Sequence, residues 1–119
     1  MKIRVGEINI LCSDAGRSLA FYRDGLGFEV LEQEGPATHL ACGATRFLLL
    51  PVARTRPARP AYCAAPEFSI DLMVENIAEA HAHFVRLGAE FASEWRPGDR
   101  SFFVRDPDGL VLEVIESAT

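Results

Sequence analysis

A tight turn followed directly by a strand is predicted by the stretch Arg105-Asp-Pro-Asp-Gly-Leu-Val-Leu-Glu-Val-Ile-Glu116. Within Asp106-Pro-Asp-Gly109, proline fixes φ at the second turn position and glycine permits a positive φ at the last. The turn separates the apolar run 101–105 from the β-branched run 110–115, so the sequence predicts a β-hairpin. One carboxylate, Glu113, interrupts the apolar pattern of the second strand. It faces either water or a binding site.

Composition and charge limit the class of protein. The 119 residues suffice for one domain with a hydrophobic core. A net charge of −5 argues against nucleic acid or an anionic membrane as partner, although it permits a cationic or metal-bound ligand. No apolar run approaches the length of a membrane span, and no signal peptide is visible. The widely spaced Cys12, Cys42 and Cys63 lack Cys-x-x-Cys pairing, so we expect a reduced, cytoplasmic protein.

The first part of the chain, residues 1–51, predicts one helix and four strands. Ser13-Asp14 provides a helix N-cap, and Gly25 and Gly27 end the helix. The strands are expected at residues 2–12, 28–33, 38–42 and 46–51. This part therefore reads β-α-β-β-β.

The same order returns after a proline-broken linker at residues 52–65, which we expect to be a connector or a flap. In residues 66–119, Asn76 caps a helix that ends at Leu87-Gly88. The strands are expected at 68–74, 89–95, 101–105 and 110–116. The chain 1–119 is thus expected to be a single domain of two modules.

The two modules can be superposed in sequence. Asp14 then falls on Asn76 and Phe21 on Phe84, which is an internal repeat of roughly sixty residues. The sequence therefore predicts an α+β fold of two tandem βαβββ modules, each with its helix on one sheet face. We expect the opposite faces to enclose a cleft. Polar residues recur on those faces, and they are Glu7, Asn9, Ser69, Asp71 and Glu113.

Three segments resemble the vicinal oxygen chelate superfamily, which includes glyoxalase I, bleomycin-resistance proteins, fosfomycin-resistance transferases and extradiol dioxygenases. They are Glu7-Ile-Asn-Ile-Leu-Cys-Ser-Asp14, Ser18-Leu-Ala-Phe-Tyr-Arg-Asp-Gly-Leu-Gly-Phe-Glu-Val30 and Asp106-Pro-Asp-Gly-Leu-Val-Leu-Glu113. The resemblance covers essentially the whole chain and implies a homodimer, but it does not specify a reaction.

The resemblance also implies four positions for divalent-metal ligands. They fall on Glu7, Ser69, Leu48 or Leu49, and Glu113. Only Glu7 and Glu113 keep a competent ligand, whereas a catalytic metal normally takes about three protein ligands. Asp71 shares a strand face with Ser69 and is a candidate third ligand, which would give an all-oxygen site suited to Mg²⁺ or Mn²⁺.

Other side chains are candidates for ligand binding. His39 is either a cleft residue that acts as acid, base or ligand, or a structural histidine. Asn9 shares the face of Glu7, while Trp95 and Phe103 either form an aromatic wall or belong to the core. His81 and His83 are two apart on a helix, a spacing unsuited to joint metal binding.

The resemblance and the missing ligands together favour a small-molecule-binding protein without a tightly bound metal, similar to bleomycin-resistance and other drug-sequestering antibiotic-resistance members. The alternative is a divalent-metal enzyme of the glyoxalase type, a lyase or isomerase that uses Mn²⁺, Ni²⁺, Zn²⁺ or Mg²⁺. A third reading is a degenerate homologue whose cleft is filled by side chains. The motifs do not decide whether the protein is an enzyme.

Overall fold

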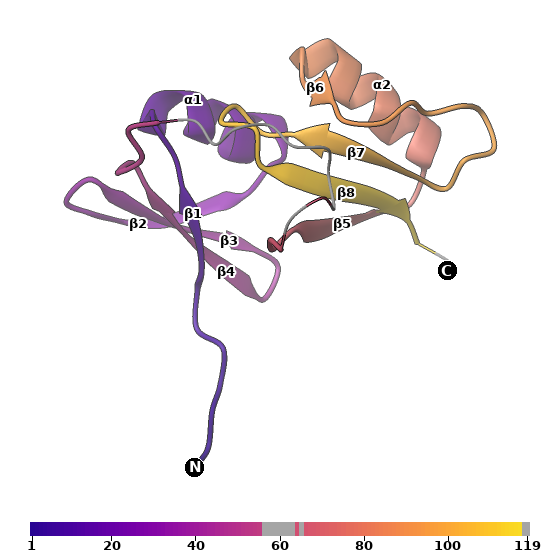
Figure 1. Cartoon of the computed structure of the whole chain (residues 1–119). Coiled ribbons are helices and arrows are strands. Elements are labelled where there is room, and N and C mark those ends of the chain that lie inside the picture. The colour runs from indigo at the N-terminus through magenta and orange to yellow at the C-terminus, as the bar shows by residue number, and fades with distance from the viewer. Residues whose placement is uncertain (56–63, 65, 118–119) are drawn as a thin grey trace. The chain divides into compact units, whose positions relative to one another are not determined.

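The computed structural model describes residues 1–55, 64 and 66–117, shown in Figure 1. The chain divides into two compact units, Met1–Arg56 and Pro57–Thr119, and each is described by itself. Most of the expected linker 52–65, including Cys63, lies outside the described residues.

The first unit has the predicted order of one helical segment and four strands. The sheet order is β1-β4-β3-β2, with β1 parallel to β4 and the other pairs antiparallel. Its elements are β1 (Ile8–Leu11), α1 (Ala15–Leu19), η1 (Ala20–Gly25), β2 (Glu29–Glu34), β3 (Ala37–Cys42) and β4 (Thr45–Leu50). Asp14 caps α1 as predicted, because its side chain accepts a hydrogen bond from the Arg17 N–H.

The prediction of a strand over residues 2–12 was wrong at its N-terminal end. Regular pairing begins at Ile8, which lies opposite Phe47, and β4 itself begins at Thr45. Residues before Gly6 therefore run past the start of their parallel neighbour and find no partner strand in this unit. Ile3 and Val5 accordingly remain 78% and 86% exposed.

The helical segment of the first unit packs on one face of its sheet through aromatic rings. Tyr22 in η1 contacts Phe28 with ring centroids 5.5 Å apart, and Phe28 contacts Phe47 of β4 at 5.1 Å. Leu40 and Leu49 are fully buried on this same face. Burial of these large apolar groups is the main favourable term that holds helix and sheet together.

The second unit repeats the arrangement. Its sheet order is β5-β8-β7-β6, again with the first strand parallel to the last. Its elements are β5 (Ile70–Val74), α2 (Ile77–Leu87), β6 (Glu90–Phe91), β7 (Ser101–Arg105) and β8 (Val111–Glu116). The α+β fold of two tandem βαβββ modules is thus confirmed.

The strand predicted at 89–95 was too long. The register with β7 ends at Phe91. One more backbone bond follows, from the Ala92 N–H to Phe103 O, and the Phe103 N–H then donates to the Ser93 hydroxyl. A loop follows in which the Arg96 N–H donates to the Asp99 carboxylate. Side-chain bonds of this kind compete with strand pairing and end it.

The helix of the second unit covers one face of its sheet. Asn76 caps α2 by accepting from the Glu79 N–H, and Gly88 ends it in the left-handed conformation with φ 71°. Phe84 of α2 meets Phe102 of β7 edge to face at 5.8 Å. Phe102 is 1% exposed, so this pair lies in the core of the unit.

The hairpin that connects β7 to β8 is confirmed. The Asp106 carboxylate accepts hydrogen bonds at 2.9 Å from the N–H groups of Asp108 and Leu110, and Gly109 takes φ 94°. Asp106 is almost fully buried. The acidic side chain therefore replaces backbone partners inside the turn, as Asx-type turns do.

Candidate functional site

Each sheet has a face that points away from its own helix, which we call the distal face. In the first unit the strand registers place Asn9, Leu48 and His39 side by side on β1, β4 and β3. Their neighbours Ile10 and Leu49, which point the other way, are buried against the helical segment. The expected polar face of the first strand therefore continues onto β3.

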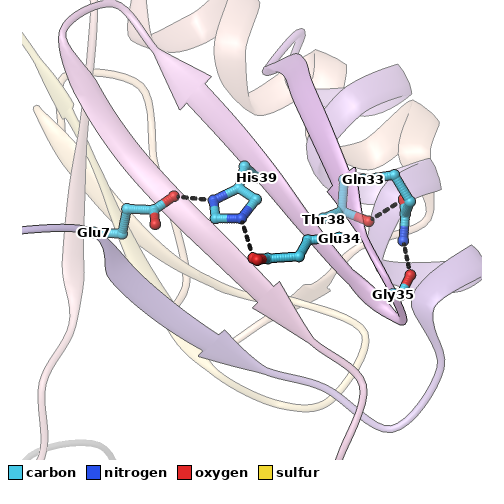
Figure 2. Close-up of polar contacts among 6 residues, drawn as sticks. All are labelled: Glu7, Gln33, Glu34, Gly35, Thr38 and His39. Carbon is cyan, nitrogen blue, oxygen red and sulfur yellow. Dashed lines mark hydrogen bonds and ion pairs between the residues drawn. The ribbon is translucent and has the colours of Figure 1, made fainter.

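Figure 2 shows a cluster on this distal face that joins the segment just before β1 to strands β2 and β3. Glu7 Oε2 lies 2.6 Å from His39 Nδ1, and Glu34 Oε1 lies 3.0 Å from His39 Nε2. Carboxylate oxygens only accept hydrogen bonds, so both ring nitrogens must carry protons. The two contacts therefore favour the imidazolium form of His39, between two carboxylates.

The charges of the cluster favour the protonated ring. The hydrogen bond to Glu34, followed by the one to Glu7, raises the pKa of His39 above its ordinary value, and desolvation opposes this only in part. Glu7 and His39 are shielded, with side chains 27% and 16% exposed, whereas Glu34 is 72% exposed. One carboxylate is thus built into the sheet and the other lies in water.

The sequence analysis did not include Glu34. It pairs with Ala37 across the β2-β3 hairpin, which makes His39 its diagonal neighbour on the same face. The Gly35-Pro36 turn was visible in the sequence and would have indicated this contact. The hairpin end is fixed by Gln33, which donates to Gly35 O and accepts from the Thr38 hydroxyl, both at 2.8 Å.

The distal face of the second unit carries the carboxylate singled out in the sequence. Glu113 lies between Asp71 of β5 and Phe103 of β7 in the strand registers. Its chain neighbours Leu112 and Val114 are buried on the helix side. The structure therefore brings Asp71, Glu113 and Phe103 together in one row.

Trp95 does not belong to that row. Its ring stacks on His81 of α2 with centroids 4.7 Å apart, and its Nε1 donates to Asp99 O. The same histidine meets Phe91 and Phe102, which places this aromatic cluster on the helix side of the sheet. Trp95 and Phe103 thus lie on opposite faces, and they do not form one aromatic wall.

The residues at the family's metal positions are a poor donor set. In the first unit Leu48 faces distally and Leu49 is buried against the helix, so neither choice supplies a ligand. The Glu7 carboxylate is already paired with His39. Over residues 1–55, 64 and 66–117, no group of three or more His, Cys, Asp or Glu side chains is placed to hold a metal ion. The donors present therefore do not fit a tightly held transition metal.

Two tandem βαβββ units with polar groups on their distal faces define the chain as a duplicated α+β protein. Residues 4–114 match the model of the Glyoxalase/Bleomycin resistance protein/Dioxygenase superfamily. The chain belongs to this superfamily.

Solved structures agree with the assignment. The trypanothione-dependent glyoxalase I of Leishmania major is 25% identical, with a TM-score of 0.76 and coverage of 97% of this chain and 87% of the other. A glyoxalase family protein from Enterococcus faecalis is 29% identical, with a TM-score of 0.71 and coverage of 95% and 97%. Lactoylglutathione lyase from Agrobacterium tumefaciens is 25% identical, with a TM-score of 0.66 and coverage of 96% and 93%.

Two further findings complete the comparison. No curated protein sequence matches the chain. Among the helices of the described residues, none has the length and apolar character required to cross a membrane.

Proposed function

We propose that the protein binds a small organic molecule at its distal faces and does so without a resident divalent metal, in the manner of the drug-sequestering branch of its superfamily. We also propose that it acts as a homodimer, which sedimentation equilibrium would test. The family membership is compatible with small-molecule binding and with enzymatic activity, and the residues at the ligand positions favour the metal-free branch.

The proposal rests on the observation that an aliphatic residue, Leu48, stands in the first unit where the second unit has a carboxylate. Glu113 pairs with Asp71 in the second unit, and Leu48 pairs with Asn9 at the corresponding place in the first. An aliphatic side chain cannot bind a cation, but it offers an apolar surface to an organic ligand. Apolar surface with a few fixed polar groups is the usual composition of a small-molecule site.

A second candidate is a glyoxalase-type metal enzyme, which is favoured by one observation in the second unit. Asp71 and Glu113 are direct neighbours in parallel register on the distal face. Two adjacent carboxylates are suitable ligands for Mg²⁺ or Mn²⁺.

Metal content and thermal shift separate the two candidates. Protein purified without chelator would be analysed for bound metal, and its Tm measured with Mn²⁺, Ni²⁺, Zn²⁺, Mg²⁺ or EDTA. A library of drug-like compounds would then be screened in EDTA. The proposal expects substoichiometric metal, no metal-dependent Tm shift and at least one compound that raises Tm in EDTA.

The matched variants are Glu113→Gln and Glu75→Gln, both of which remove one carboxylate. Glu75 is exposed and lies outside the row of Asp71, Glu113 and Phe103. A metal-dependent Tm rise that is lost in Glu113→Gln and kept in Glu75→Gln would replace the proposal by the metal-enzyme alternative. A library without any stabilising compound would count against ligand binding itself.

A further inference from the structure

We propose that His39 Nε2 recognises a carboxylate group of the ligand, and that the Glu34 carboxylate occupies the same binding position when no ligand is bound. The inference rests on the proposed function and names the chemical class of its ligand. It concerns the first unit only, where two carboxylates from separate parts of the chain contact the His39 ring.

The first step is that His39 is fixed in orientation. Its Nδ1 is held by Glu7 at 2.6 Å, and the ring lies on a strand paired on both sides. A carboxylate on one ring nitrogen orients the imidazole and directs the other N–H in a set direction. His39 Nε2 is therefore a prearranged donor on the distal face.

The second step is that Glu34 is easily displaced. Its side chain is 72% exposed and ends a hairpin strand, whereas Glu7 is 27% exposed. Ion pairs with an exposed partner contribute little net stability, because water competes for the carboxylate. The hydrogen bonds of Gln33 keep the hairpin in place without help from Glu34.

The pKa of His39 responds more to Glu34 than to Glu7, although the Glu7 contact is the shorter one. We assign the anchoring role to Glu7 because its contact is both shorter and better shielded from water. A ligand carboxylate in place of Glu34 would restore the same charge-assisted bond. The charge in direct contact with the ring is then the same as before.

The neighbouring positions indicate the rest of the ligand. Leu48 lies beside His39 on β4, and Asn9 follows on β1. Two strand spacings separate His39 from Asn9, about 10 Å. Arg46 lies opposite Ala41 and adds a second cation to this face. A carboxylate with an apolar body that covers Leu48 fits this order, and an aromatic acid is the simplest example.

Sodium benzoate and its neutral counterpart benzamide test the idea. Each would be titrated into the protein while the His39 ring nitrogens are followed by long-range ¹H–¹⁵N NMR. Benzoate is expected to shift Nε2, and benzamide to bind at least about tenfold more weakly, the loss expected for one charged hydrogen bond. Glu34→Ala should tighten benzoate binding several-fold because the competing carboxylate is gone.

Glu32→Ala is the matched control, because Glu32 pairs with His39 in the β2-β3 register and is also exposed to solvent. It removes the same charge without removing the bond to Nε2. His39→Gln should abolish the preference for benzoate over benzamide, with the NMR spectrum serving as the check on folding.

Equal affinity gains in Glu34→Ala and Glu32→Ala would overturn the inference, since only general electrostatics would then be at work. So would an unmoved His39 signal during a saturating benzoate titration of Glu34→Ala. A compound from the EDTA screen that binds without moving the His39 signal would refute this inference and leave the proposed function standing.

Discussion

Leu48 in the first sheet holds the position that Glu113 holds in the second. Leu48 pairs with Asn9 across parallel strands, and Glu113 pairs with Asp71 across the equivalent parallel strands. One distal face is therefore acidic at this point while the other is apolar. The duplication has kept the backbone arrangement and changed the chemistry.

Leu48→Glu should give the first unit an affinity for divalent metal. The new carboxylate would lie beside His39 and near Glu7, so one imidazole and two carboxylates would be available. We expect a Mn²⁺- or Zn²⁺-dependent rise in Tm that is absent in wild type. Leu50→Glu, on the same strand and face, should not gain it. Equal gains in both variants would contradict the prediction.

The cluster around His39 should make stability depend on pH. The folded-state pKa of His39 is raised by Glu34 and Glu7, so its stabilising contribution is complete below the unfolded pKa. That contribution begins to fall above the unfolded pKa of about 6.5. It is lost once the pH has risen through the folded-state pKa of His39. The Tm difference between wild type and His39→Gln should therefore be larger near pH 6 than near pH 9. A Tm difference that grows with pH would contradict a raised pKa of His39 in the folded state.

Phe102→Ala and Phe103→Ala should differ strongly although they are adjacent in sequence. Phe102 is 1% exposed and packs on Phe84, whereas Phe103 is half-buried on the distal face. Phe102→Ala should lower the free energy of unfolding by about 3–5 kcal/mol. Phe103→Ala should have a clearly smaller effect. Urea denaturation followed by circular dichroism measures both.

Both helix caps should contribute similarly. Asp14 accepts from the Arg17 N–H and Asn76 from the Glu79 N–H, each three residues onward. Asp14→Ala and Asn76→Ala should each lower the free energy of unfolding by about 1 kcal/mol, and serine at either position should restore most of it. Serine variants no more stable than the alanine ones would argue against capping as the cause.

The β7-β8 turn should require an acceptor at Asp106. Alanine would leave the N–H groups of Asp108 and Leu110 without their partner in a largely buried turn, at a cost of about 1–3 kcal/mol. Asp106→Asn keeps an oxygen acceptor and should lose less. Chemical denaturation of the two variants compares them directly, and an equal loss would point to charge instead of hydrogen bonding.

Local signals in the sequence predicted much of this structure. The caps at Asp14 and Asn76 and the hairpin at 106–109 depend on a few neighbouring residues, and all three formed. The orientation of Glu113 followed from strand alternation between buried neighbours. Short-range rules suffice for features of this kind.

Features that depend on pairing between strands were missed. The start of β1 at Ile8 depends on where β4 begins, and the contact of Glu34 with His39 depends on the pairing of β2 with β3 from the Gly35-Pro36 turn onward. Trp95 lies in a loop, where strand alternation does not apply. Its stacking on His81 places it on the helix side of the sheet. Periodicity alone contains none of this information.

Each described strand pair joins strands of the same unit, and in each unit the first strand lies beside the last. In the two sheet orders β1 and β2 are the edge strands of the first sheet and β5 and β6 those of the second, so all the pairing of a sheet is made within one contiguous segment of the described chain. Such a segment can be copied as a whole without breaking a sheet, which explains how one ancestral half could have given rise to two. Afterwards the distal residues of each copy could change independently of the other copy. The difference between Leu48 and Glu113 is an example.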